Sequence, residues 1–244
     1  MHYLEGFAKG IELVRSMIDH KKVLVLAMNG PGVGAGAAWF QGTSDLFFAA
    51  KDSWLQVTFS QLGLVPEMGA AVNWAHHIGP HRSNDWLMLG GKATADELHA
   101  QGLCNKIFPK ENFQGHVQTY LKEILSDRSG KSMMEAKRLQ NKATRDARIL
   151  ALFEAVNSLA ERFVDGEPAK RMAAKAQELK GEPSSFSQAC INVIVLTILQ
   201  TSGASARQRC EAHSCRICIS NVCQPTASHS LSSVAPMPAV LVYQ

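Results

Sequence analysis

The chain has 244 residues, 46% apolar and 19% charged, which is long enough for a folded domain with a substantial core. Its net charge of +4 is too small to indicate a nucleic-acid-binding protein. The longest apolar run, 191–199, is interrupted by Asn192 and Thr197 and is shorter than the roughly 18 residues of a membrane span. The first residues do not have the pattern of a secretory signal. We therefore expect neither a nucleic acid nor a membrane among the partners.

The first sixty residues predict helices and strands in alternation. Residues 2–20 carry apolar side chains at helical spacing, and Val23–Met28 is an apolar run typical of a strand buried on both faces. A glycine-rich segment follows and leads into a short helix over 37–42. Strands are predicted at 46–50 and 54–59.

The next stretch continues the alternation and then becomes helical. A turn at 63–69 precedes helices at 70–78 and 81–90. Thr94 and Glu97 have the spacing of a capping box, so a helix is predicted over 93–102, closed by Gly102. A strand at 103–108 follows, and 113–180 is predicted to be almost entirely helical. The fold class is therefore α/β, with a helical region at the C-terminal side.

The segment 29–41 reads NGPGVGAGAAWFQ, and its glycines allow another group to approach the backbone closely. Gly32, Gly34 and Ala37 fit a dinucleotide-binding pattern, with Asp52 as the later acidic residue. The helix after the glycines is too short for the crossover of about a dozen residues that such a unit needs. A phosphate-binding P-loop is excluded because no Lys-Ser or Lys-Thr pair follows. A tight turn that binds no ligand remains an alternative interpretation at this point.

Several short motifs occur in an order that is typical of a known protein family. N-G-x-x-x-G-x-G-A is followed by Ser44-Asp45-Leu46, then by LGLVPEMG at 62–69 and GLCNKIFP at 102–109. This order resembles the crotonase (enoyl-CoA hydratase/isomerase) superfamily, clearly over 23–109 and more weakly to Lys180. The resemblance implies a partial crotonase-like ββα spiral fold with a C-terminal helical region.

The resemblance also implies a site. Gly36 would donate its N–H to a thioester carbonyl, where a helix N-terminus offers unpaired donors and positive potential. Glu67 matches the single acid/base glutamate of the peroxisomal Δ3,Δ2-enoyl-CoA isomerases, which act in fatty acid β-oxidation. The apolar neighbours of Glu67 should raise its pKa. Hydratases carry two glutamates, at positions where this chain has Trp39 and Phe59.

The resemblance implies that the protein needs no cofactor, because CoA is part of the acyl-CoA substrate. It also implies that no metal is needed. Two other functions stay open: a non-catalytic crotonase-like fragment that binds acyl-CoA, and an enoyl-CoA hydratase. At a helix N-terminus Glu67 could also serve only as a favourable surface charge. His76 and His77 are interpreted as packing or surface residues, since adjacent helical residues point about 100° apart. The basic residues between Lys131 and Arg148 either contact CoA phosphates or form a solvated helix face.

Three regions are predicted: a truncated crotonase-like core at 1–110, a helical oligomerisation region at 111–183, and a tail at 184–244. Members of the superfamily begin with further strands and a second oxyanion loop, and we expect their absence to expose a sheet edge. The tail has four charged residues and five of the six cysteines, and we predict that it is disordered. Its C-x4-C-x2-C-x4-C spacing leaves a zinc site as the alternative, in a protein without enzymatic activity.

The resemblance implies a homo-oligomer, a trimer or hexamer, with the helices of 113–180 packed between subunits. It implies a peroxisomal location, although the chain ends in LVYQ and not in an S-K-L-type signal. A mitochondrial location is the alternative.

Overall fold

A computed structural model describes residues 2–180 and 193–197. Its elements in chain order are α1 (His2–Ile18), β1 (Leu24–Met28), β2 (Gly32–Val33), α2 (Gly34–Thr43), β3 (Leu46–Ala50), β4 (Trp54–Gln56), the 3-10 helix η1 (Ser60–Leu62), α3 (Ala70–Ile78), α4 (Pro80–Leu87), β5 (Lys92–Thr94), α5 (Ala95–Ala100), β6 (Lys106–Phe108), α6 (Phe113–Leu125), α7 (Gly130–Asp165), α8 (Glu167–Lys180) and β7 (Val193–Thr197). The α/β prediction is confirmed.

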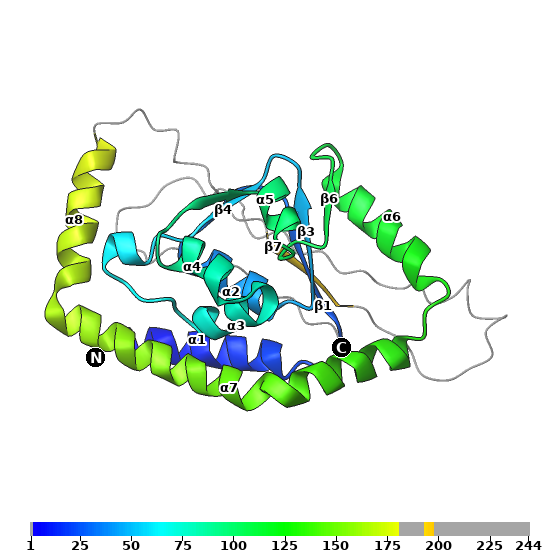
Figure 1. Cartoon of the computed structure of the whole chain (residues 1–244), viewed down its shortest axis with the longest axis horizontal. Helices are drawn as coiled ribbons and strands as arrows, with labels where there is room; N and C mark the ends of the chain where they lie inside the picture. The colour runs from blue at the N-terminus through cyan, green and yellow to red at the C-terminus, as the bar shows by residue number, and fades with distance from the viewer. Residues whose placement is uncertain (1, 181–192, 198–244) are drawn as a thin grey trace.

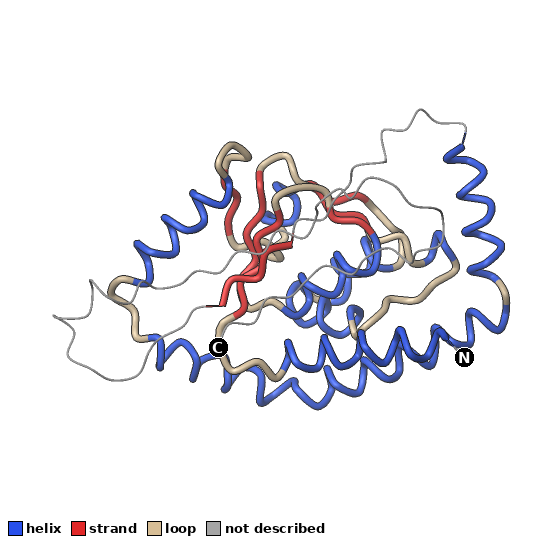
Figure 2. The backbone as a smooth tube through the Cα atoms, turned by 180° about the vertical axis from the view of Figure 1, so that it is seen from behind, coloured by secondary structure: helices blue, strands red, loops and turns tan. Residues whose placement is uncertain are grey.

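The strands form two sheets (Figure 2). The larger has the order β6-β3-β1-β7, in which β3 is parallel to both β1 and β6. The smaller has the order β2-β4-β5. Residues of β1 alternate between two clusters of the core: Leu24, Leu26 and Met28 lie in one, and Val25 and Ala27 lie in the other. This strand is therefore buried on both faces, as its apolar run predicts.

The edge of β1 that we expected to be exposed is covered. β7 pairs with it in the antiparallel direction, with Leu24 opposite Thr197 and Met28 opposite Val193. The segment 193–197 is thus a strand, where the sequence predicted disorder. The rest of the tail and its five cysteines lie outside the described residues, so the zinc alternative lies there too. Pairing satisfies the backbone groups of β1, which accounts for the difference.

Two layers of helices lie on one side of the larger sheet (Figure 1). α2 and α3 lie between the sheet and the pair made by α1 and α7. α6 covers the other face of the sheet, where Phe113, Val117 and Leu121 join the cluster around Val25. α7 buries Leu152 and Val156 against α1. The C-terminal helices therefore bury part of their apolar surface within their own chain.

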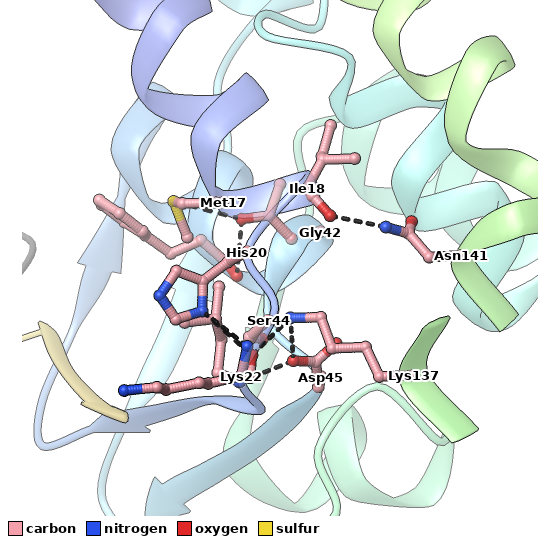
Figure 3. A network of polar contacts seen from close by, with 12 residues as sticks. Met17, Ile18, His20, Lys22, Gly42, Ser44, Asp45, Lys137 and Asn141 are labelled. Atoms are coloured by element: carbon pink, nitrogen blue, oxygen red, sulfur yellow. Dashed lines mark hydrogen bonds and ion pairs between the residues drawn. The ribbon is translucent and has the colours of Figure 1, made fainter. Parts of the chain in front are cut away.

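Basic residues of α7 hold this helix to the body of the molecule (Figure 3). The Nζ of Lys137 lies 2.7 Å from Asp45 Oδ2 and donates to the carbonyl of Lys22 at 2.8 Å. Asn141 donates to the carbonyl of Ile18, where α1 ends, at 2.6 Å. These contacts join α7 to the end of α1 and to the loops that precede β1 and β3.

Two arginines complete the attachment. Arg145 binds Asp19 through Nε and Nη2, at 2.6 and 2.8 Å. Arg148 donates to Asn73 at 2.6 Å and to the carbonyl of Gly42, near the end of α2, at 3.3 Å. Cations at helix C-termini are favourable. Lys137 and Arg148 are largely buried and have intramolecular partners, so the alternative of a solvated face was wrong for these two residues, whereas the side chain of Arg145 is 43% exposed.

Candidate active site

The first turn of α2 presents backbone donors. The helix begins at Gly34, which has φ +73°, three residues before the predicted start. Gly36 is its third residue, so its N–H belongs to the first turn, which has no acceptor within the helix. No side chain caps this end through its N-cap residue, Val33. A methyl group built on Gly36 would meet nothing within 4 Å, so the space at this position is open.

Glu67 is the first residue of a tight turn that leads into α3. The N–H of Ala70 donates to its carbonyl at 2.9 Å, and the two central residues, Met68 and Gly69, have φ +48° and +70°. These values are typical of a type I′ turn, which costs free energy at a residue other than glycine. The side chain of Met68 is buried, in a cluster with Val14 and Leu152. Packing therefore holds the turn, and with it Glu67. No local pattern in the sequence indicates that Met68 has a strained backbone.

Burial raises the pKa of the Glu67 carboxyl to about 7. The carboxyl is partly buried, and desolvation is the one cause of the shift, with no hydrogen bond or ion pair to it from the described residues. A raised pKa agrees with the prediction from the apolar neighbours. A carboxylate with a pKa near neutrality can both remove and return a proton.

Trp39, in the second turn of α2, links this helix to the turn at Glu67. Trp39 packs against the cluster that contains Met68 and also against the main core cluster, where Ala35 and Leu64 pack as well. Trp74 on α3 donates its Nε1–H to the carbonyl of Ala38 at 2.9 Å, which fixes α3 to α2. The start of α2 and the turn at Glu67 are thus supported by one block of packed helices.

Neither hydratase position holds a carboxylate. Phe59 is buried in the main core cluster, and Trp39 is partly buried between two clusters. His76 and His77 lie in the last turn of α3, where the Nε2 of His77 is 3.3 Å from the carbonyl of Gly42. Among the described residues, no group of three or more His, Cys, Asp or Glu side chains could hold a metal ion.

A cavity of about 690 Å³ adjoins the start of α2. It lies between the smaller sheet, η1 and α8, and Val33, Gln61, Ala174 and Lys175 are among the residues that line it. Its size is in the range of small-molecule sites. Val33 directly precedes α2, so the cavity reaches the end of the helix that carries the backbone donors. Glu67 is not one of its lining residues.

The chain matches a known protein family over most of its length. The sequence model described as "Enoyl-CoA hydratase/isomerase" matches residues 5–178. The chain belongs to this family, as the resemblance predicted. Its fold is that of the crotonase superfamily: it aligns with an enoyl-CoA hydratase/isomerase from Pseudoalteromonas atlantica at a TM-score of 0.63 and 21% identity, over 68% of this chain and 65% of that one.

Within the family, the chain is similar to enoyl-CoA delta isomerases. It is 37% identical over 111 residues to the mouse protein "Enoyl-CoA delta isomerase 3, peroxisomal". The aligned region covers 46% of this chain and 35% of that protein. It is 35% identical over 111 residues to rat enoyl-CoA delta isomerase 2, covering 46% of this chain and 28% of the relative. The chain thus spans about a third of the length of these relatives. Among its described residues, no helix has the length and apolar character to cross a membrane.

Proposed function

We propose that the protein is a Δ3,Δ2-enoyl-CoA isomerase with Glu67 as its acid/base. The Glu67 carboxylate removes a proton from C2 of a 3-enoyl thioester, and the resulting dienolate takes the same proton back at C4. The double bond moves from C3–C4 to C2–C3, with no net change in atoms or oxidation state. The observation that carries the proposal is the partly buried carboxyl of Glu67, with a pKa of about 7.

Gly36 is the proposed donor to the thioester oxygen. Negative charge develops on that oxygen in the dienolate, and one preorganised donor contributes about 3 kcal/mol to such a transition state. The open space at Gly36 and the place of its N–H in the first turn of α2 support this role. The cavity beside α2 is the proposed site for part of the acyl-CoA molecule.

Hydration would need a second acid/base group to activate water. The buried Phe59 and the partly buried Trp39 offer none at the two positions that hydratases use. The proposal therefore assigns isomerisation, for which one carboxylate is sufficient, and not water addition. The similarity to two enoyl-CoA delta isomerases supports the same choice.

The test is the conversion of a 3-enoyl-CoA by the full chain, followed by the absorbance of the conjugated product. Glu67→Gln should lower the rate at least about 100-fold, since a positioned base contributes about 10²–10⁴. The wild-type rate should rise with pH through about 7, where the carboxyl loses its proton. Glu111→Gln, at an exposed carboxylate, is the matched control and should retain the rate.

Three outcomes would contradict the proposal. An equal rate with Glu67→Gln would remove Glu67 as the base. Hydration of a 2-enoyl-CoA without isomerisation would favour a hydratase. Binding of a saturated acyl-CoA with no turnover of the 3-enoyl compound would favour the non-catalytic alternative.

We further propose that the reaction belongs to fatty acid β-oxidation in the peroxisome. The support is the similarity to a relative whose name includes "peroxisomal". Imaging of a tagged chain beside peroxisomal and mitochondrial markers tests this, and a mitochondrial signal would contradict it. The tag belongs at the N-terminus, so that the C-terminal residues stay free.

A further inference from the structure

A polar cavity of about 170 Å³ lies at the C-terminal ends of α1, α2 and α3, where they meet helix α7. Met17 and Ile18 are its apolar lining residues, and the other ten are polar or charged. The cavity has room for several water molecules or for one small ligand, and it is well below the roughly 300–1,000 Å³ of sites for drug-sized molecules. It is therefore a candidate site for a small polar molecule or ion, separate from the larger cavity beside the start of α2.

Three side chains with a full charge line this cavity. Lys137 and Arg148 are positive, and Asp45 is negative. With His76 and His77 counted as neutral, two positive charges thus face one negative charge. Lys137, whose side chain is 10% exposed, binds Asp45 at 2.7 Å (Figure 3). The carboxylate at the cavity is therefore already paired, and Arg148 is left without one.

Arg148 forms its hydrogen bonds with neutral acceptors. Its guanidinium donates to Asn73 at 2.6 Å, to Asn141 at 2.9 Å and to the carbonyl of Gly42 at 3.3 Å. In the part of the chain that the structure describes, Arg148 forms no ion pair, and two of its five N–H groups have no acceptor. Burial lowers the pKa of this guanidinium, so its surroundings disfavour the positive charge. A largely buried charge without a partner is costly, and a bound counter-ion would offset that cost.

The end of α2 offsets the charge of Arg148 only in part. A helix C-terminus carries about half of a negative elementary charge. Arg148 contacts this end through the carbonyl of Gly42, at 3.3 Å, which is longer than most hydrogen bonds. The same carbonyl also lies 3.3 Å from the Nε2 of His77. A long contact to a shared acceptor leaves much of the positive charge to be balanced by another group.

We propose that this cavity binds a small tetrahedral oxyanion, inorganic phosphate or sulfate, as the counter-ion of Arg148. The free N–H groups of Arg148 belong to a planar fork that suits the oxygens of such an anion. Lys137 uses two of its three N–H groups, for Asp45 and for the carbonyl of Lys22, so the third can donate to the anion. The hydroxyl of Thr144, one turn before Arg148, is a further donor at the cavity wall. The site lies at the opposite end of α2 from Gly36, so the inference does not depend on the proposed reaction.

Thermal unfolding of the full chain in inorganic phosphate tests the proposal, with sodium chloride at equal ionic strength as the reference. The melting temperature of the wild type should rise in a saturable way, with a dissociation constant of about 1 mM. At 10 mM phosphate the rise should be about 3–5 °C. Arg148→Met removes the charge that needs the counter-ion, and it should weaken the response to phosphate at least about tenfold.

Thr144→Glu places a carboxylate at the cavity, four residues before Arg148 on the same helix, where it can form an ion pair. This variant should be more stable than the wild type without phosphate and should no longer respond to it. The variant also keeps the test decisive if Arg148→Met does not fold. Ala143→Glu adds the same charge at an exposed neighbouring position that points about 100° away, and it should keep the response.

Four results would overturn the inference. One is a wild type whose melting temperature does not change up to about 20 mM phosphate, which would show that the helix ends balance Arg148 by themselves. Another is a rise that does not saturate, as the general stabilising effect of phosphate salts predicts. A response that Thr144→Glu retains in full would place the anion elsewhere. Competition between phosphate and a saturated acyl-CoA would make the cavity part of the CoA site and not a site for a free anion.

Discussion

Glu67→Gln should stabilise the protein at neutral and alkaline pH. The carboxyl has a pKa of 4.5 in a solvated reference state and of about 7 in the folded chain. Between these values the unfolded chain loses its proton while the folded chain keeps it, so the stability of the wild type falls as pH rises from 4.5 to 7. The loss levels off above pH 7 at about 3 kcal/mol, from a shift of about 2.5 units at 1.36 kcal/mol each.

The assay compares urea unfolding of the wild type and of Glu67→Gln at several pH values, followed by tryptophan fluorescence. The amide does not titrate, so the difference in unfolding free energy should grow by about 2.5 kcal/mol between pH 5 and pH 8 in favour of the variant. Any constant cost of the amide itself cancels in this comparison. The m-value should stay unchanged, because the surface exposed on unfolding is the same.

Glu97→Gln is the control with the opposite sign. Hydrogen bonds from the hydroxyl and the N–H of Thr94 lower the pKa of Glu97, so its carboxylate stabilises the folded chain above the unfolded pKa. Its amide variant should therefore be less stable than the wild type at pH 8. A difference for Glu67→Gln that does not vary with pH would refute the reasoning, because it would show that the carboxyl is solvated in the folded chain.

Three further predictions concern the cavity, the attachment of α7 and the edge of β1. Ala174→Trp fills the cavity beside α2 from an exposed position, so acyl-CoA affinity should fall at least about tenfold in calorimetry while the melting temperature is unchanged. Lys137→Met removes the charged donor that Asp45 and the carbonyl of Lys22 share, and urea unfolding should show a loss of about 1–3 kcal/mol. Deletion of 193–197 frees the edge of β1, and light scattering should detect aggregation that the full chain does not show.

Local sequence signals predicted much of the fold. The strand 46–50 and the helix 70–78 agree with β3 and α3 in both bounds. Thr94 and Glu97 form the predicted capping box, with Thr94 as the N-cap of α5. These elements are set by side chains a few residues apart, which a sequence displays directly. Helix α2 begins earlier than predicted because Ala35, Ala37 and Phe40 pack in the main core cluster, which outweighs the low helix propensity of the glycines beside them.

Local sequence patterns did not predict the long-range contacts. β7 forms because 193–197 meets a strand about 170 residues earlier in the chain, and a low charge content gives no sign of such a partner. The contacts of the basic residues of α7 with Asp19, Asp45 and Asn73 join distant parts of the chain, so neither of the two alternatives left open for these residues included them. At the candidate site, the motif order pointed to Gly36 and Glu67, while the positive φ of Met68 follows only from the packed turn.

Two adjacent residues in the turn at Glu67 each lower the stability of the folded chain. A desolvated carboxylate costs stability above pH 4.5, and a methionine with positive φ costs about 1–2 kcal/mol more. Both are held by the buried side chain of Met68, which packs against residues from α1 and α7. The contacts that fasten α7 therefore act on the same block that holds Glu67 in its apolar surroundings. A site that needs a base with a pKa near 7 has to accept such a cost, because the burial that raises the pKa is the burial that destabilises the folded chain.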